Sequence, residues 1–306
     1  MVEILIDATV RAGTPILFAT LGAIVNERAG IINLGIEGLM LIGALAGFAG
    51  TFASGSLLIG VLAAFVAAFL AGCIHAFVTV LLRGNQIVSG LALTMFGIGI
   101  TALFGRGMVG QTIVGFERLA IPGLSSLPVI GKPFFNQDLL IYASFVLVAG
   151  LSVFFYRTRT GLALRTVGEN PGAADTCGIS VSWYRFLAVA VGSGIVGVGG
   201  AYLSLASTPM WIENMSAGRG WIAVALVIFA SWSSPRALAG AYLFGGITAM
   251  QLRFQAMGTT VSVHILQMLP YFFTILVLVI STLRLQKGAS QQPEGLGQPY
   301  DREDRK

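Results

Sequence analysis

Apolar residues occur in long runs along most of this chain, and polar residues are confined to short segments between the runs. A helix needs about 20 mostly apolar residues to cross the hydrocarbon core of a bilayer, and it bonds its own backbone groups internally. The pattern therefore predicts an all-α, polytopic membrane helical bundle of about 8–10 transmembrane helices. The expected helices lie at residues 12–25, 36–53, 57–82, 86–105, 138–156, 186–206, 221–232, 237–253 and 263–283.

Two of these runs, 12–25 and 221–232, are shorter than a full span, and each adjoins a polar segment that contains glycine. NERAGIINLG follows the first run, and ENMSAGRG precedes the second. We expect broken or re-entrant helices at both places. Discontinuous helices at matching positions of two halves often frame a transport path. We therefore expect Ala29–Glu37 and Ala217–Ile222 to occupy corresponding positions in the bundle.

Composition limits what lies outside the membrane. Charged residues make up 10% of the chain, less than half the usual share of about 25%, so little surface remains for an extramembrane domain. The basic residues behind the net charge of +5 fall in short connections between apolar runs, a membrane-topology pattern that excludes a nucleic-acid surface. Cys73 and Cys177 are expected at different depths, so no disulfide or metal pair is predicted.

The direction of the spans follows from the basic residues. With the polar stretch 156–185 inside, nine basic residues up to Lys287 face the cytoplasm and six face outward, which favours this orientation. The inner set is Arg28, Arg83, Arg157, Arg159, Arg165, Arg185, Arg236, Arg284 and Lys287; the outer set is Arg11, Arg106, Arg118, Lys132, Arg219 and Arg253. We therefore expect residues 1–285 to form the transmembrane domain. The polar tail 286–306, rich in glycine, proline and glutamine, is expected to be disordered and cytoplasmic.

The stretch 156–185 contains a short helix with both ends marked. Asn170 is suited to cap it, Pro171 to begin it, and Gly178 to end it in the left-handed conformation, which leaves about two turns. Small residues are expected on its exposed faces, and acidic residues stand beside basic ones. These residues are Glu169, Gly172, Ala173, Ala174 and Asp175. Such a surface fits closely against another backbone and indicates a docking site.

Polar side chains inside the spans form the second group of candidates, because they are costly in lipid and usually face a bundle interior or a watery path. Glu37 lies at a helix start, where the dipole favours its charge; it either lines a path or is a headgroup carboxylate paired with Arg28. Asn33 either lines the path or caps that helix. Asn85, Gln86 and Ser89 are candidates for the same path, although a lone serine commonly bonds to its own helix.

Enzyme chemistry has little support in the sequence. The chain contains no Walker sequence and no GxGxxG motif after a strand, so no nucleotide site is predicted. No Ser/His/Asp or Cys/His set has compatible placement, and His75 is an isolated residue expected to pack between helices or to lie at the membrane interface. The sequence therefore predicts neither catalytic residues nor a cofactor.

Three segments carry a family resemblance: ERAGIINLGIEGLMLIGALAG (Glu27–Gly47), NQIVSGLALTMFG (Asn85–Gly97) and RTRTGLALRTVGENPGAADTCGI (Arg157–Ile179). Together they resemble the permeases of bacterial ABC importers for branched-chain amino acids, simple sugars and nucleosides. Within that group the chain is most similar to the smaller permease subunit of nucleoside importers of the guanosine and purine type. The resemblance covers about Thr14 to Arg284.

The resemblance implies a function and a set of partners. In such permeases a cytoplasmic AAxxxG loop forms the coupling helix, and here Ala173, Ala174 and Gly178 match it, with Gly172 where a glutamate is common. The implied partners are a cytoplasmic ATP-binding subunit that binds the ATP, a second permease subunit and an extracytoplasmic substrate-binding lipoprotein. The implied place is the bacterial plasma membrane, among membrane lipids, and the implied cargo is a small-molecule solute.

Other interpretations stay open at this level. The solute could be a simple sugar rather than a nucleoside, since no aromatic pair has a spacing diagnostic of base stacking. A proton-coupled secondary transporter in which Glu37 titrates, and a membrane scaffold that transports nothing, are alternatives from other classes.

Overall fold

The computed structural model describes residues 2–257, 262–285 and 292–302 and confirms the all-α membrane bundle. The long helices are α1 (Val2–Arg28), α2 (Ile36–Ser54), α3 (Leu57–Ala76), α4 (Gln86–Gly105), α6 (Leu139–Arg157), α9 (Val181–Tyr202), α11 (Ser234–Ala256) and α12 (Val263–Leu285). Shorter helices are α5 (Gly131–Phe135), α7 (Arg159–Glu169), α8 (Pro171–Thr176) and α10 (Arg219–Phe229). The remaining elements are η1 (Phe77–Leu81), η2 (Arg106–Met108), η3 (Leu203–Ser207) and the paired strands β1 (Leu119–Ala120) and β2 (Asn136–Gln137).

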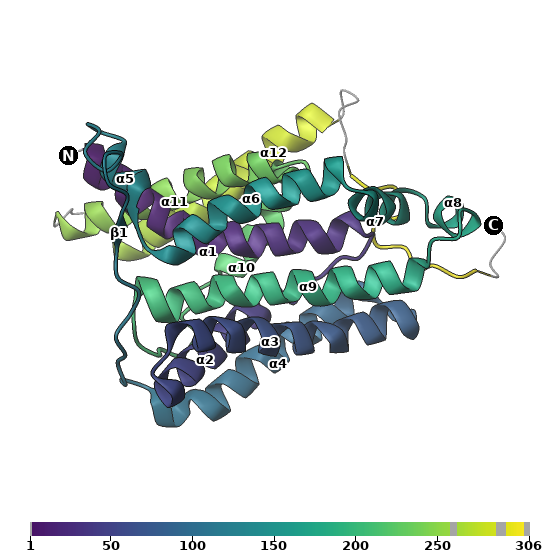
Figure 1. Cartoon of the computed structure of the whole chain (residues 1–306), viewed down its shortest axis with the longest axis horizontal. Coiled ribbons are helices and arrows are strands. Elements are labelled where there is room, and N and C mark those ends of the chain that lie inside the picture. The colour runs from purple at the N-terminus through teal and green to yellow at the C-terminus, as the bar shows by residue number, and fades with distance from the viewer. Residues whose placement is uncertain (1, 258–261, 286–291, 303–306) are drawn as a thin grey trace.

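The long helices run side by side along the long axis of the molecule (Figure 1). Six helices among the described residues are long and apolar enough to cross a membrane. The two most buried of these are α1 and α9, which form the centre of the bundle: α1 packs on α9, α10 and α11, and α9 also packs on α2 and α3. The elements α7 and α8 lie at one end, and α5, β1 and the N-terminus lie at the other (Figure 1).

The first helix is longer than the apolar pattern predicts. The run 12–25 was expected to be a short, broken span, but α1 extends over 27 residues from Val2 to Arg28. Its polar first turns find partners in the connection between α4 and α6: Asp7 accepts hydrogen bonds from Arg118 at 3.2 Å and from Gln137 at 2.6 Å. The first helix is therefore complete, and the irregular backbone lies after it, between α1 and α2. The run 221–232 is short, as predicted, and forms the 11-residue helix α10.

The polar stretch 156–185 contains two helices rather than one. The expected short helix is present as α8, but α7 precedes it and was not predicted. It begins where the Thr158 hydroxyl accepts a hydrogen bond from Gly161 N at 3.0 Å. One face, with Leu164 and Val167, is buried, and the opposite face is exposed. This helix escaped prediction because its mixed composition has no long apolar run.

The tail also differs from the expectation of disorder. Residues 292–302 lie against the end of the bundle that carries α7 and α8, while 286–291 and 303–306 fall outside the described residues. Gly295 N donates to Gly168 O at 2.9 Å, and Gly297 N donates to Gly30 O at 3.1 Å. Glycine permits this order because its backbone can approach a neighbouring backbone without a side chain between them.

Close helix packing depends on glycine where α2 crosses α9. A Cβ atom added to Gly43 would lie 2.2 Å from Gly197 O, so the two backbones are in direct contact. Small residues at such crossings let membrane helices approach closely, which substitutes for the hydrophobic effect that is missing between helices in lipid.

The Gly43→Val variant tests this crossing. We expect it to lower the free energy of unfolding by about 1–3 kcal/mol or more, because the new side chain displaces a backbone instead of a flexible neighbour. Gly99→Val is the matched control, since a Cβ at Gly99 meets nothing within 4 Å. Thermal unfolding in detergent measures both; equal melting temperatures would show that the crossing tolerates separation.

Candidate functional site

The first broken segment, residues 29–35, has its backbone held by side chains. Gln86 Oε1 accepts a hydrogen bond from Ile32 N at 2.7 Å, and Thr94 Oγ1 donates to Leu34 O at 2.9 Å. Asn33 Oδ1 accepts from Gly35 N at 2.8 Å. Non-helical backbone within a membrane protein must find such partners because lipid offers none. The segment is therefore a fixed part of the bundle.

The second broken segment meets the first at Glu37. The Glu37 carboxylate accepts hydrogen bonds from Ser216 Oγ at 2.5 Å, Gly218 N at 2.8 Å and Gly220 N at 2.7 Å. It thereby caps the start of α10, where free N–H groups and the helix dipole favour a negative charge. Gly220 is needed at this place, since a Cβ there would lie 2.5 Å from Glu37 Cα. The two glycine-broken segments are thus in direct contact.

This meeting point lies deep in the bundle. At a rise of about 1.5 Å per residue, α10 is about 16 Å long, roughly half the thickness of the hydrocarbon core. After α10, Trp232 is bonded to the end of α1: its Nε1 donates to Glu27 at 2.7 Å, and its carbonyl accepts from Arg28 at 3.0 Å. Arg28 therefore does not pair with Glu37 as one interpretation supposed. Arg219, expected on the outer side, instead begins α10 near the middle.

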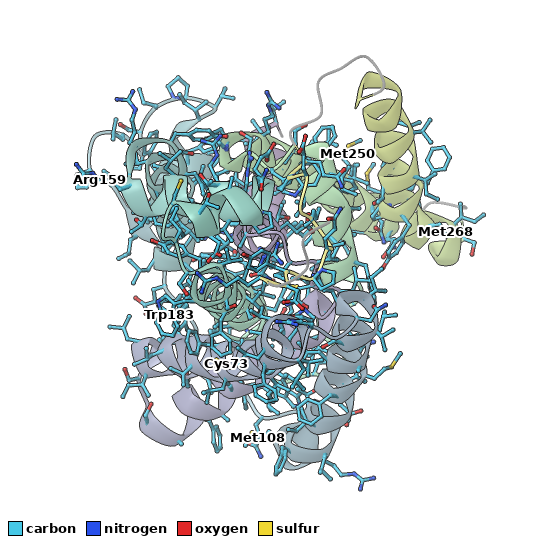
Figure 2. The ribbon with its side chains drawn as sticks, turned by 90° about the vertical axis from the view of Figure 1, so that its right-hand side faces the viewer. Cys73, Met108, Arg159, Trp183, Met250 and Met268 are labelled. Carbon is cyan, nitrogen blue, oxygen red and sulfur yellow. The ribbon has the colours of Figure 1, made fainter. Side chains whose placement is uncertain are left out.

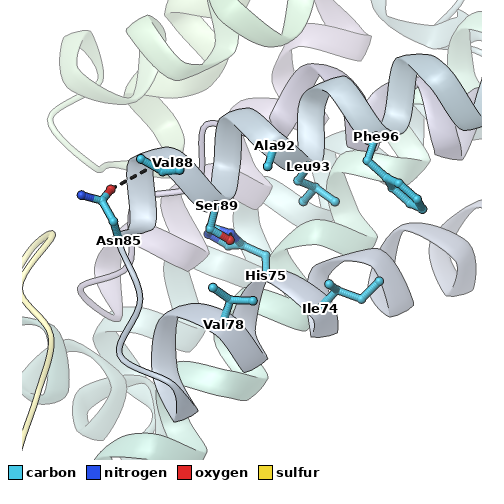
Figure 3. A pocket seen from close by; sticks show the side chains of 9 residues that line it. All are labelled: Ile74, His75, Val78, Asn85, Val88, Ser89, Ala92, Leu93 and Phe96. Atoms are coloured by element: carbon cyan, nitrogen blue, oxygen red, sulfur yellow. Dashed lines mark hydrogen bonds between the residues drawn. The ribbon is translucent and has the colours of Figure 1, made fainter.

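The other predicted path residues have separate positions. Asn85 is exposed and caps α4, accepting from Ile87 N at 3.0 Å and Val88 N at 3.1 Å. Asn33 and Gln86 are buried, and both side chains accept hydrogen bonds from the backbone of the first broken segment. Ser89 faces His75 across the α3–α4 contact, with 2.9 Å between Ser89 Oγ and His75 Nδ1 (Figure 3). The structure therefore places Asn33 and Gln86 together in the buried interior and Asn85 and Ser89 together on the α3–α4 side.

A mostly apolar groove of 380 Å³ lies between α3 and α4, and Asn85, Ser89 and His75 are among its lining residues (Figure 3). His75 was expected to pack between helices or to lie at the membrane interface; it is buried, and its Nε2 lies 3.2 Å from Ile32 O on the first broken segment. His75 therefore joins Gln86 and Thr94 among the side chains that contact the backbone of that segment. Its two partners lie 14 and 43 residues away, so no local sequence signal could have indicated them.

The α8 helix has the predicted caps. Asn170 Oδ1 accepts from Ala173 N at 2.9 Å, Pro171 occupies the first turn, and Gly178 has a φ of +79°. Its exposed surface differs from the expectation at one residue: Ala174 is fully buried against Val167 and Val181. The outward small face consists of Gly172, Ala173, Thr176, Cys177 and Gly178. Sequence spacing could not decide this because two adjacent alanines are equally small.

The acidic residues beside α8 have different surroundings. Asp175 forms an ion pair with Arg302 at 3.0 Å. Glu169 is exposed and lines a polar cavity of 530 Å³ together with Arg28, Arg165 and Tyr156. Figure 2 looks onto this end of the molecule, with Arg159 and Trp183 at its periphery.

Among the described residues, no group of three or more His, Cys, Asp or Glu side chains could hold a metal ion.

Known proteins match the chain over nearly its whole length. The family model described as "Branched-chain amino acid transport system / permease component" matches residues 5–282. The "Putative glucose ABC transporter permease protein TsgC13" of Haloferax volcanii is 40% identical, over 98% of this chain and 98% of the relative. The nucleoside ABC transporter permease protein NupC of Lactococcus lactis is 36% identical, over 87% and 88%. The guanosine ABC transporter permease protein NupQ of Bacillus subtilis is 30% identical, over 98% and 97%. No solved structure matches the chain.

Replacement of Glu37 by glutamine tests the contact between the broken segments. Gln keeps the shape but turns one acceptor oxygen into a donor that faces N–H or O–H groups, so we expect the free energy of unfolding to fall by about 1–3 kcal/mol. Glu213→Gln, an exposed glutamate in the same connection, serves as the control. Melting temperatures in detergent give the comparison; the contact carries no stability if the two variants unfold together.

Proposed function

The chain belongs to the branched-chain amino acid transport system permease family and is a multi-pass permease of an ABC transporter, and from this premise we propose that it imports nucleosides and is coupled to ATP hydrolysis through α8. The ATP is bound by a separate cytoplasmic ATP-binding subunit. The permease itself supplies the path and the docking surface, and it has no catalytic residues or cofactor in this proposal.

The exposed face of α8 is the observation that carries the coupling proposal. Gly172, Ala173 and Cys177 present little side chain, so a partner groove can approach the backbone of the helix closely. Buried Ala174 and the Asn170 cap fix which face points outward. This surface stands at the end of the bundle away from the N-terminus (Figure 1). In the proposed orientation that end is cytoplasmic, together with the C-terminal tail.

A second permease subunit is supported by the start of α10. Ala217 is exposed and has a φ of +47°, so irregular backbone lies at the surface beside Gly218, where Tyr271 Oη of α12 donates to Ala217 O at 3.2 Å. The length of α10 places this backbone about 16 Å from Trp232, which is bonded to the end of α1, and lipid-exposed loops do not occur within the hydrocarbon core. Protein or a water-filled cavity must therefore cover it. We infer a second, different permease subunit on this face, with the solute path between the two subunits.

The position of Glu37 favours this arrangement over a proton-coupled carrier. Its carboxylate already accepts three hydrogen bonds, and protonation would remove at least one of those acceptor sites. A carboxylate whose oxygens are occupied by the cap of α10 is suited to hold the two broken segments together. The family also accounts for an energy source outside the chain, which neither the carrier nor the scaffold interpretation requires.

The choice of solute rests on the named relatives. NupC and NupQ are named for nucleosides and guanosine, and TsgC13 for glucose. Nucleosides and glucose share a hydroxylated sugar ring, so a ring of this kind is the common chemistry. We propose a nucleoside as the solute and a free sugar as the second candidate, which the 40% identity to TsgC13 favours. An extracytoplasmic substrate-binding lipoprotein would deliver it at the plasma membrane of a bacterium.

The Ala173→Arg variant tests α8 as the coupling element. We expect normal membrane insertion but a loss of ATP-binding subunit on co-purification and a fall in uptake of about tenfold or more, because a large charged side chain disrupts a close-packed interface. Ala53→Arg is the matched control: Ala53 is exposed near the end of α2, at the opposite side of the bundle. Unchanged co-purification of the Ala173 variant would refute the assignment.

Competition for uptake tests the solute. Cells that express the chain with its partner subunits should accumulate labelled guanosine, and unlabelled adenosine should compete while glucose does not. The measurement is initial uptake rate with and without each competitor, and cells lacking this chain give the background. Accumulation of labelled glucose with no guanosine uptake would select the sugar importer instead.

A further inference from the structure

The described part of the tail, residues 292–302, forms a strap across the end of the bundle that carries α7 and α8 (Figure 1). Two backbone hydrogen bonds begin it: Gly295 N donates to Gly168 O at 2.9 Å, and Gly297 N donates to Gly30 O at 3.1 Å. Gly168 lies in the last turn of α7, and Gly30 belongs to the first broken segment. The strap thus joins the coupling loop to the segment that continues to Glu37.

Steric fit at the start of the strap is close. A Cβ at Gly295 would lie 2.8 Å from Gly168 O, and a Cβ at Gly168 would lie 2.2 Å from Arg28 O. Three backbone segments from α1, α7 and the tail therefore pack directly on one another. A displacement of α7 must move the strap and the end of α1 with it, since close-packed backbones have no free space between them.

The middle of the strap is held by a buried arginine and an aromatic ring. Arg185 of α9 is only 2% exposed, and its Nη1 donates to Gln298 O at 2.9 Å. Tyr300 packs against the cluster of Val167, Ala174 and Val181, which joins α7, α8 and α9. The buried side of α8 is therefore covered in part by the tail, although the tail is distant in sequence.

Ion pairs fasten the last residues. Arg302 pairs with Asp175 of α8 at 3.0 Å, and Asp301 pairs with Arg83 in the turn between η1 and α4. Exposed ion pairs contribute little stability alone, but these two set the direction of the strap. A helix of two turns such as α8 is not stable in isolation, and the strap adds to the packing of Ala174 against α7 and α9 that orients it.

We propose that residues 292–302 are a positioning element that makes α8 and the first broken segment move as one body. This inference rests on the proposed function, because it assigns the strap to transmission between the ATP-binding subunit and the path. When α8 shifts, the strap carries the shift from Tyr300 and Arg302 through Gly297 to Gly30. The strap contributes to coupling and does not itself contact the solute.

Truncation provides the first test. A chain ending at Gln291 lacks the strap, and a chain ending at Arg302 is the control. Each is assembled with its partner subunits in liposomes, and guanosine, or glucose if the competition experiment selects it, is the transported probe. We expect the strapless complex to bind the ATP-binding subunit and hydrolyse ATP, while the solute transported per ATP falls about fivefold or more, within the range of allosteric coupling.

A point variant covers the case in which truncation prevents folding. Gly295→Val places a side chain against Gly168 O, and Glu294→Val, whose side chain is exposed, is the matched control. A reduced transport-to-ATP ratio in Gly295→Val alone supports the proposal. An unchanged ratio in the variant overturns it.

Other outcomes are also decisive. Loss of ATP-binding subunit from both the truncated chain and Gly295→Val would make the strap part of the docking surface and would overturn a transmission role. Failure of the intact chain to bind any ATP-binding subunit would instead refute the proposed coupling itself, so the two ideas fail separately.

Discussion

Backbone that leaves a helix inside a membrane must be bonded by the protein, and the Glu37 carboxylate meets this requirement for two segments at once. It lies at the start of α2, directly after the first broken segment, and it accepts the amides that begin α10. Side chains from α3 and α4 contact three further backbone groups of residues 29–35, which are Ile32 N, Ile32 O and Leu34 O. The position of the half-length helix, and of the irregular backbone beside it, depends on this set of contacts.

The same set of contacts connects the deep part of the bundle to its end. The first broken segment begins at Ala29, after Arg28 has bonded to the Trp232 carbonyl that follows α10. Gly168 at the end of α7 packs on Arg28 O, and α8 follows at once. The distance from the docking surface to Glu37 is thus bridged by directly packed backbone. This continuity suits a permease, in which a partner at one end must change the path in the middle.

Much of the fold could be predicted because membrane helices have a strong local signal. The runs at 36–53, 57–82 and 86–105 match α2, α3 with η1, and α4 closely, since an apolar run of that length has few other stable structures. The caps of α8 were equally local: Asn170, Pro171 and Gly178 act within a few residues. By contrast, α7 was missed because an amphipathic helix of 11 residues at a membrane surface lacks the apolar run that indicates a span.

The sequence by itself determined the class of protein, the spans, the two broken segments and the short capped helix, because these follow from composition and from spacing over a few residues. Only the tertiary structure decided what those parts contact. Glu37 and Ser216 are 179 residues apart, and Arg185 and Gln298 are 113 residues apart. It also decided that Ala173 faces outward while Ala174 is buried. Periodicity along a chain carries no information about such partners, since they are chosen by packing between helices distant in sequence.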